Sequence, residues 1–431
     1  MLKRTLALSL LLTAQALPAP AAPAAPAAIG PVTVAWSDAT HTKIRITWTE
    51  TTPVANTLSA DSDADEGDGF PVGEFGTTTA AQPNEYLVTA KQLSKTTDPA
   101  SHSWIVVAGG GTQARSVDFD QFLYDGDLQL SFVGDKIRWT LPPDDSVDGT
   151  PGDPLDLPKK FTYTARQRVD SNPASSDECS NTDYVSTTPT GDLPNRGQAY
   201  ALPVFTENEW GGRVDYGWVA YTKSMSVASP ASTPYGGTTT LRGTVNETVL
   251  NEEVSTPYCE ELFLPAADEP VTVMQRTAGN APWTVVGTTK TDGLGNYTAV
   301  FRNPGHRQYQ VVRPSKVEYG TSATYGYTRY VEPVRATTRI VSAKFINPVV
   351  NLGTQPQAYL WVDPAGTQKA ALQFKNASGA WQGVTYKTLY AGRGLIAFPW
   401  NKRGVTQFRW YVPATPVADA SYSGVFTLTV R

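Results

Sequence analysis

The sequence is poor in the residues that build most active sites. Its 431 residues include two cysteines and three histidines (His41, His102 and His306), and charged residues make up only 17%. A hydrolytic triad needs one histidine held between a serine and a carboxylate, and no G-x-S-x-G segment occurs. Zinc needs clustered histidine or cysteine ligands, which these scattered residues do not supply. We therefore predict no catalytic residues and no enzyme activity.

Long apolar runs are also missing, apart from one short run at the start. Met1-Leu2-Lys3-Arg4 is basic, Thr5 to Ala14 is apolar, and Ala-Gln-Ala at 14–16 fits a signal-peptide cleavage site. The apolar run is about half the length that spans a bilayer. Leu17 to Ala28 is almost pure Ala and Pro, so cleavage after Ala22 or Ala28 is an alternative. We predict a secreted protein with no membrane span, either released or held noncovalently at the cell surface.

The balance of charge gives no electrostatic attraction to nucleic acid, because the net charge is −5. Thr, Gly, Pro, Trp and Tyr are plentiful, which suits pleated sheets joined by tight turns and is unfavourable for long helices. A chain of this length exceeds what one hydrophobic core usually supports. The composition therefore predicts an all-β chain of several domains.

A repeat of about one hundred residues, the usual size of a β-sandwich domain, marks the C-terminal half. Val271-Thr-Val-Met-Gln-Arg is followed by Trp283-Thr-Val-Val-Gly and by Tyr309-Gln-Val-Val-Arg-Pro. Leu372-Gln-Phe-Lys is followed by Trp381 and by Phe408-Arg-Trp-Tyr-Val-Pro, so that Trp283 matches Trp381 and Pro314 matches Pro413. A fainter repeat in the N-terminal half relates Lys43-Ile-Arg-Ile-Thr-Trp to Lys136-Ile-Arg-Trp-Thr-Leu.

Alternation of apolar and polar residues predicts which side chains enter the cores of these domains. Ile44, Ile46 and Trp48 should face one core, and Ile137, Trp139 and Leu141 another. By the same argument Trp283 and Trp381 are expected to be core residues.

The C-terminal half resembles the tandem immunoglobulin-like repeats of secreted bacterial proteins. The N-terminal half resembles fibronectin type III domains through its Ile-x-Ile-x-Trp strand. The expected fold is a series of immunoglobulin-like or fibronectin-like β-sandwiches. Its predicted boundaries are 1–28 for the signal peptide and Ala/Pro-rich segment, then 29–121, 122–228, 229–333 with an insertion at 246–265, and 334–431. The resemblance implies a spacer, adhesion or ligand-binding role and no catalytic residue.

The two cysteines, Cys179 and Cys259, are expected to form a disulfide, because an even count after a signal peptide favours pairing. The bond would join the second domain to the insertion in the third and fix one against the other. Closing so long a loop contributes about 4 kcal/mol in a chain-entropy model.

One acidic loop is a candidate calcium site. Asp61, Asp63, Asp65 and Asp68 are closely spaced, and calcium prefers carboxylate oxygens. The segment lacks the glycine and the final glutamate of an EF-hand loop, and a solvated acidic loop is the interpretation that we favour. A second acidic run at 144–153 is judged in the same way. No other cofactor is expected.

Glu207, Glu209 and Trp210 are the one candidate ligand-binding group, with Trp210 stacking on a sugar ring. The alternative, which we favour, is a plain turn whose tryptophan folds back on the sandwich. The sequence thus predicts a non-catalytic structural or binding protein whose partner is an extracellular protein or glycan. The rival hypothesis is a carbohydrate-binding protein or glycoside-active enzyme that uses loops of the first two domains.

Overall fold

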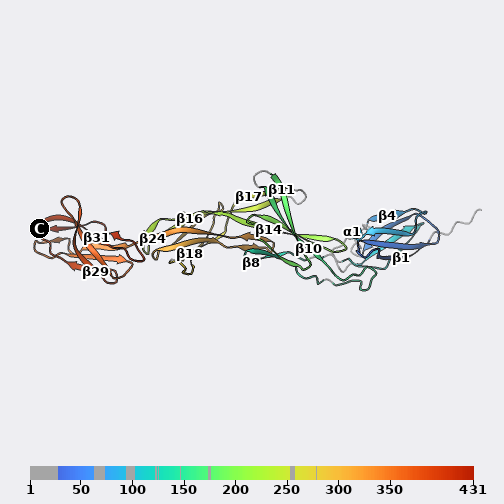
Figure 1. The fold of residues 1–431 in the computed structure, drawn as a ribbon, viewed down its shortest axis with the longest axis horizontal. Coiled ribbons are helices and arrows are strands. Elements are labelled where there is room, and N and C mark those ends of the chain that lie inside the picture. Colours follow the sequence, from blue (N-terminus) through green and yellow to red (C-terminus); the bar gives the residue numbers. More distant parts are fainter. Residues whose placement is uncertain are drawn as a thin grey trace, which may run out of the picture. The chain divides into compact units, whose positions relative to one another are not determined.

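The structure is a computed structural model that describes most of the chain after residue 27. The described ranges are 28–62, 73–93, 102–121, 124, 126–145, 147–172, 176–252, 258–277 and 279–431. Strands dominate these ranges, and the single helix within them, α1 (Ala90–Leu93), has four residues. In the described chain no helix is long and apolar enough to cross a membrane. The all-β fold of tandem sandwiches is confirmed (Figure 1).

The first compact unit is built on two facing sheets of the N-terminal sandwich. One sheet has the order β1-β2-β5 and the other β4-β3-β6-β7. The strands are β1 (Ile29–Trp36), β2 (Lys43–Glu50), β3 (Asn56–Ser62), β4 (Glu74–Thr78), β5 (Glu85–Thr89), β6 (Ser103–Gly109) and β7 (Thr112–Arg115). Ile44, Ile46 and Trp48 on β2 are buried in the core between the sheets, as their alternation predicts.

Two segments from beyond the predicted first domain belong to this unit. Asp144–Phe161 and Glu207–Arg213 group with the first sandwich, although the sequence placed both in the second domain. Leu155 and Trp210 from these segments are buried in the first core. The Trp36 Nε1–H group also donates a hydrogen bond of 3.0 Å to the Leu155 carbonyl. The segments belong to the first unit because their apolar side chains complete its core.

The second compact unit begins with a three-stranded sheet of order β12-β9-β8, which belongs to the second sandwich. Its strands are β8 (Gln129–Val133), β9 (Lys136–Thr140) and β12 (Thr190–Leu193). A larger sheet of the same unit contains β10 (Thr162–Asn172), β11 (Ser176–Ser186), β13 (Tyr200–Glu207) and β14 (Gly212–Met225). Ile137, Trp139 and Leu141 are fully buried, so the second predicted core face is confirmed.

The third sandwich shares a strand with the second. Strand β16 (Thr238–Glu252) pairs with β20 (Asn296–Arg302) over its first half and with β14 and β17 (Cys259–Pro265) over its second half. Leu241 and Val245 point into the third core, whereas Leu250 packs beside Cys259. The remaining strands are β15 (Ser232–Pro234), β18 (Pro270–Arg276), β19 (Thr284–Lys290), β21 (Arg307–Arg313) and β24 (Tyr327–Thr337).

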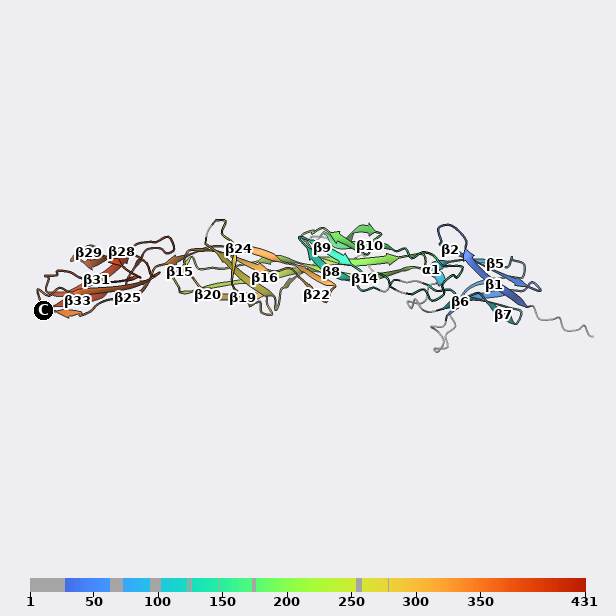
Figure 2. The same ribbon diagram turned by 90° about the horizontal axis from the view of Figure 1, so that it is seen from below.

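Two hairpins from the third domain extend the large sheet of the second. The predicted insertion at 246–265 contains the end of β16 and all of β17, which pair with each other, and residues 253–257 lie outside the described ranges. The hairpin of β22 (Lys316–Glu318) and β23 (Ser322–Tyr325) adds β23 in parallel to β14. Figure 2 shows β22 beside β8. Backbone hydrogen bonds therefore cross from one sandwich to the next where the sequence predicted a boundary near residue 228.

The fourth sandwich has a sheet of order β25-β27-β30 and a sheet of order β26-β33-β31-β28-β29, with β32 pairing β31. Its strands are β25 (Arg339–Phe345), β26 (Val349–Val350), β27 (Gln357–Asp363), β28 (Gln368–Lys375), β29 (Trp381–Leu389), β30 (Arg393–Ala397), β31 (Gly404–Val412), β32 (Ser421–Tyr422) and β33 (Phe426–Val430). Alternate residues of β28 and β31 enter the core, including Leu372, Phe408 and Trp410. The intervening residues form the outer face of the larger sheet.

Candidate functional site

The structure does not place Trp210 on the surface. Its side chain is 2% exposed, it stacks on Phe119 at a centroid distance of 5.9 Å, and it lies 5.4 Å from the Trp36 ring. Asn208 shapes the turn, because its Oδ1 accepts hydrogen bonds from the backbone N–H groups of Trp210 and Gly211. The ring is therefore part of the first core and is not available to stack on a sugar.

The two glutamates beside Trp210 have separate surroundings. The Glu207 carboxylate lies 3.6 Å from the Lys91 ammonium on the surface of the first unit. Burial raises the pKa of Glu209, and a backbone hydrogen bond partly opposes that rise. The turn thus provides one ion-paired carboxylate and one half-buried carboxylate, without the exposed aromatic ring that sugar binding at this turn required.

Of the four aspartates of the predicted calcium loop, the structure describes Asp61. Asp61 accepts a hydrogen bond of 2.9 Å from Trp104 Nε1 and one of 3.0 Å from the Arg115 guanidinium. Asp63, Asp65 and Asp68 lie outside the described residues. Asp61 therefore joins β3 to β6 and β7, and the calcium prediction for this loop stays a prediction.

The second acidic run contributes to a cluster of three aspartates that was not predicted from the sequence. Carboxylate oxygens of Asp120, Asp153 and Asp156 lie within 4.8 Å of one another, and such oxygens are the ligands that hard cations prefer. Their hydrogen bonds come from the surrounding loop: Asp120 accepts from the Gly149 N–H at 2.7 Å and Asp153 from the Thr150 hydroxyl at 2.9 Å. These bonds give the carboxylates a structural role in holding residues 149–156 against the first sandwich.

The stability of the first unit should depend on pH through Asp120. Burial raises the pKa of Asp120 to about 6, and the nearby charges of Asp148 and Asp153 act in the same direction. An unfolded aspartate has a pKa of about 3.9, so the folded state binds more protons between these values. The free energy of unfolding should therefore fall as pH rises from about 4 to about 6 and change little above that.

In the Asp120→Asn variant, the free energy of unfolding should fall less over this pH range. Asparagine can still accept the Gly149 hydrogen bond, but it does not titrate. Hydrogen exchange of the β2 amides, compared at pH 4.5 and 7 after correction for intrinsic rates, measures the effect. An equal pH dependence in the variant and the unmodified chain would show that Asp120 is not its source.

The three histidines occupy unrelated places. The His102 Nδ1 lies 2.9 Å from an Asp118 carboxylate oxygen, and His41 packs edge-on against Trp36. The His306 Nδ1 accepts a hydrogen bond from the Ala336 N–H group at 3.1 Å in the second unit. His41 and His306 thus serve packing and backbone contacts, and His102 contacts Asp118 on the surface of the first unit.

The predicted disulfide is confirmed. Cys179 on β11 and Cys259 on β17 are bonded, with their Cα atoms 4.9 Å apart and a separation of 80 positions in sequence. Figure 1 shows β11 and β17 side by side. Ala199, Ala201 and Leu250 pack against the two cysteines. The bond therefore connects the β10–β11 hairpin of the second sandwich to the β16–β17 hairpin that leaves the third.

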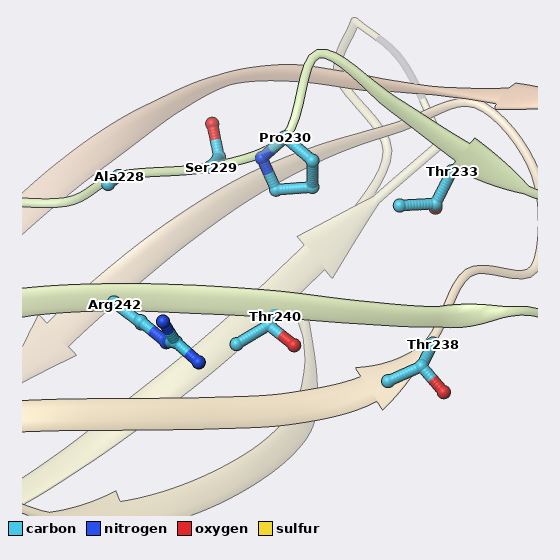
Figure 3. A pocket seen from close by; sticks show the side chains of 7 residues that line it. All are labelled: Ala228, Ser229, Pro230, Thr233, Thr238, Thr240 and Arg242. Carbon is cyan, nitrogen blue, oxygen red and sulfur yellow. The ribbon is translucent and has the colours of Figure 1, made fainter.

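A shallow groove lies in the third sandwich where the chain crosses from one sheet to the other. Ala228 and Arg242 exchange backbone hydrogen bonds, and then β15 crosses to pair with β24 in the opposite sheet. The crossing leaves a groove of about 460 Å³ (Figure 3). Its lining residues are Ala228, Ser229, Pro230, Thr233, Thr238, Thr240 and Arg242. We interpret this groove as a consequence of the strand crossing, because its lining is made of small side chains and one arginine.

The expectation that Trp283 and Trp381 are core residues is wrong. Both rings are half-buried on outer sheet faces, each beneath a guanidinium group: Arg276 lies 4.5 Å from the Trp283 centroid, and Arg409 lies 4.4 Å from that of Trp381. The repeat correctly paired the two tryptophans, since Trp283 immediately precedes β19 and Trp381 is the first residue of β29. Alternation showed which residues share a face but could not show which face meets the core.

In the fourth sandwich, this arrangement is part of a larger group that the sequence analysis missed. We call it the cationic face, defined by Lys369, Gln373, Trp381, Tyr386, Arg409 and Tyr422. The registers of β28 with β29 and β31, and of β31 with β32, place these residues on the outer side of one sheet. A count of charged residues in each domain would have indicated this face. Residues 334–431 contain 11 Lys and Arg but 2 Asp and Glu, a net charge of +9, whereas the whole chain carries −5.

Comparisons with known proteins do not assign this chain to a family. No family model matches the chain, and no curated protein matches it. Among solved structures, the FN1–FN3 domains of chicken CNTN1 are 10% identical to this chain, with a TM-score of 0.19. That match covers 71% of this chain and 98% of the other. A similarity at this level carries no argument about function.

Proposed function

We propose that this chain is an extracellular, non-catalytic structural and binding protein whose sandwiches form a stiff support for a binding surface. The observation that carries the proposal is β16, which belongs to two consecutive sandwiches without a break. An ordinary linker between domains has few contacts and leaves the domains free to move. A shared strand instead links the two cores through continuous backbone hydrogen bonds.

Three further connections support stiffness at the same junction. The β23 strand pairs with β14, the disulfide joins β11 to β17, and the buried Arg313 side chain contacts residues from β14 and β16. The disulfide also supports an extracellular location, because such bonds persist in oxidising compartments. A protein that only tethered two ends would not need these connections.

Two of the three residues considered for glycoside chemistry have roles in the fold, which supports a non-catalytic function. Trp210 fills the first core, and Glu207 pairs with Lys91. The proposed function requires no cofactor, and its partner is an extracellular macromolecule.

The distribution of distances between the second and third sandwiches tests the proposal. Spectroscopic labels on noncanonical residues at Val185 on β11 and Val285 on β19, both exposed, avoid the native disulfide. We expect one narrow distance distribution in the intact chain. Inserting Gly-Gly-Ser after Thr244, between the two paired halves of β16, should broaden it.

The same insertion in the turn after Gly279, between β18 and β19, is the matched control and should leave the distribution narrow. A broad distribution in the intact chain would overturn the proposal, since β16 would then not hold the sandwiches together.

A further inference from the structure

The cationic face presents aromatic rings and positive charge together. The Arg409 guanidinium lies between two rings, 4.4 Å from the Trp381 centroid and 4.0 Å from the Tyr422 centroid. Its Nε–H donates a hydrogen bond of 2.8 Å to Gln373 Oε1, which fixes its orientation. Arginine held in this way keeps further N–H donors in a planar fork that matches a carboxylate or sulfate group.

A second ring and cation extend the face across the sheet. The Lys369 ammonium lies 5.0 Å from the Tyr386 ring, and Tyr386 is 63% exposed. Tyr422 is 52% exposed on the other side of Arg409. Exposed rings of this size are uncommon on a surface without a partner when they gather in one place.

A groove continues the positive charge beyond the end of β28. Its volume is about 550 Å³, and Lys375 and Lys402 are among its lining residues. The Lys402 ammonium lies 4.9 Å from the Phe374 ring and 5.6 Å from the Trp400 ring. Both rings belong to the buried core, so the groove contributes its two lysines to the positive surface.

Carboxylate side chains of the fourth sandwich are occupied elsewhere. Asp363 forms an ion pair with Arg339 at 2.5 Å, and Asp419 forms one with Arg335. These are the two acidic residues in 334–431, so no carboxylate of this domain neutralises the cationic face. The third sandwich differs, since residues 229–333 contain 8 Lys and Arg against 10 Asp and Glu. The positive charge is therefore a property of one domain and not of the repeat.

We propose that the cationic face and the adjoining groove bind an acidic polysaccharide. This inference rests on the proposed function as a binding protein and names its class of ligand. Aromatic rings pack against the C–H faces of sugars, while arginine and lysine pair with carboxylate or sulfate groups. A chain of sugars contacts Tyr386, Arg409 and the groove lysines at once. The disulfide favours a glycan over nucleic acid, because it indicates a compartment outside the cell.

Binding of the full chain to four polymers of matched length tests this proposal. The probes are polygalacturonate, which carries carboxylates, dextran sulfate, neutral dextran and duplex DNA. We expect polygalacturonate or dextran sulfate to bind at least tenfold more tightly than the neutral and nucleic-acid polymers, with affinity falling as salt increases. Comparing the two acidic polymers distinguishes a carboxylate ligand from a sulfate ligand.

Variants assign the binding to the face. Lys369→Gln combined with Lys375→Gln and Tyr386→Ala should weaken binding at least tenfold, and all three side chains lie on the surface, so folding should be retained. Arg276→Gln is the matched control, because Arg276 covers Trp283 and its Nε–H donates to Gln308 Oε1 in the third sandwich as Arg409 does with Gln373 in the fourth. It should change affinity less than twofold.

Several results would overturn the inference while leaving the proposed stiff support intact. These are no binding to either acidic polymer, equal binding to DNA, or equal loss in the Arg276→Gln control. Salt-sensitive self-association that the triple variant abolishes, without polymer binding, would assign the face to a second copy of the chain instead.

Discussion

Replacing Arg313 with methionine is expected to lower the free energy of unfolding of the second compact unit by about 3–5 kcal/mol. The Arg313 side chain is 1% exposed at the junction of the second and third sandwiches. Its guanidinium contacts Glu247 at 2.6 Å and Glu269 at 3.3 Å, and it donates a hydrogen bond of 2.8 Å to the Thr222 hydroxyl. Removing Arg313 leaves the partly buried Glu247 carboxylate without its counter-charge, whereas Glu269 keeps its ion pair with Lys316 at 2.5 Å. Breaking a buried pair in this way costs more than the pair itself contributes.

Urea unfolding followed by circular dichroism measures the change, with Arg138→Met as the control. Arg138 also forms a two-point ion pair, at 2.7 and 3.1 Å with Asp192, but its side chain is 44% exposed. Exposed pairs contribute less than about 1 kcal/mol, so the control should unfold almost as the unmodified chain does. Adding Glu247→Leu to Arg313→Met should recover part of the loss. Equal effects of Arg313→Met and Arg138→Met would show that the junction does not depend on the buried charge.

Removing the disulfide is expected to lower the free energy of unfolding by a similar amount. In a chain-entropy model, a bond that closes a loop of 80 residues contributes about 4 kcal/mol to stability. The variant with Cys179→Ala and Cys259→Ala should therefore unfold at lower urea concentration, and the amides of β17 should exchange hydrogen fastest. They should exchange first because β17 is an edge strand that pairs with β16 alone in its sheet.

Reductant separates the covalent effect from the loss of the sulfur atoms. It should destabilise the unmodified chain and leave the alanine variant unchanged. If the alanine variant were as stable as the oxidised chain, the β16–β17 hairpin would be held by its backbone pairing and packing alone.

Much of the fold could be predicted from short patterns. Ile44, Ile46 and Trp48 on β2, and Ile137 and Trp139 on β9, alternate with polar residues, and all are buried as expected. Successive side chains of a strand point to opposite faces, so local sequence alone identifies the residues that share a face. The pairing of Cys179 with Cys259 followed from there being two cysteines, and the equivalence of Trp283 and Trp381 from the repeat.

The candidate site was less predictable, for a physical reason. Alternation groups residues by face but does not say which face meets a partner sheet, so Trp381 was assigned to the core although it lies under Arg409 on the outer side. Trp210 was correctly favoured as folding inward, but the core that it fills belongs to the first unit and not to the second. The positions of both tryptophans are set by contacts with distant segments and not by the residues adjacent in sequence.

The sequence by itself determined that the protein is a chain of β-sandwiches, which residues alternate on each strand, and that positive charge is concentrated after residue 334. Tertiary structure alone decided that β16 would serve two sandwiches, that the β22–β23 hairpin would join the second, and that Arg409 would lie between Trp381 and Tyr422. The difference arises because side-chain alternation is a local property of the backbone, whereas strand partners are chosen by contacts between segments far apart in sequence.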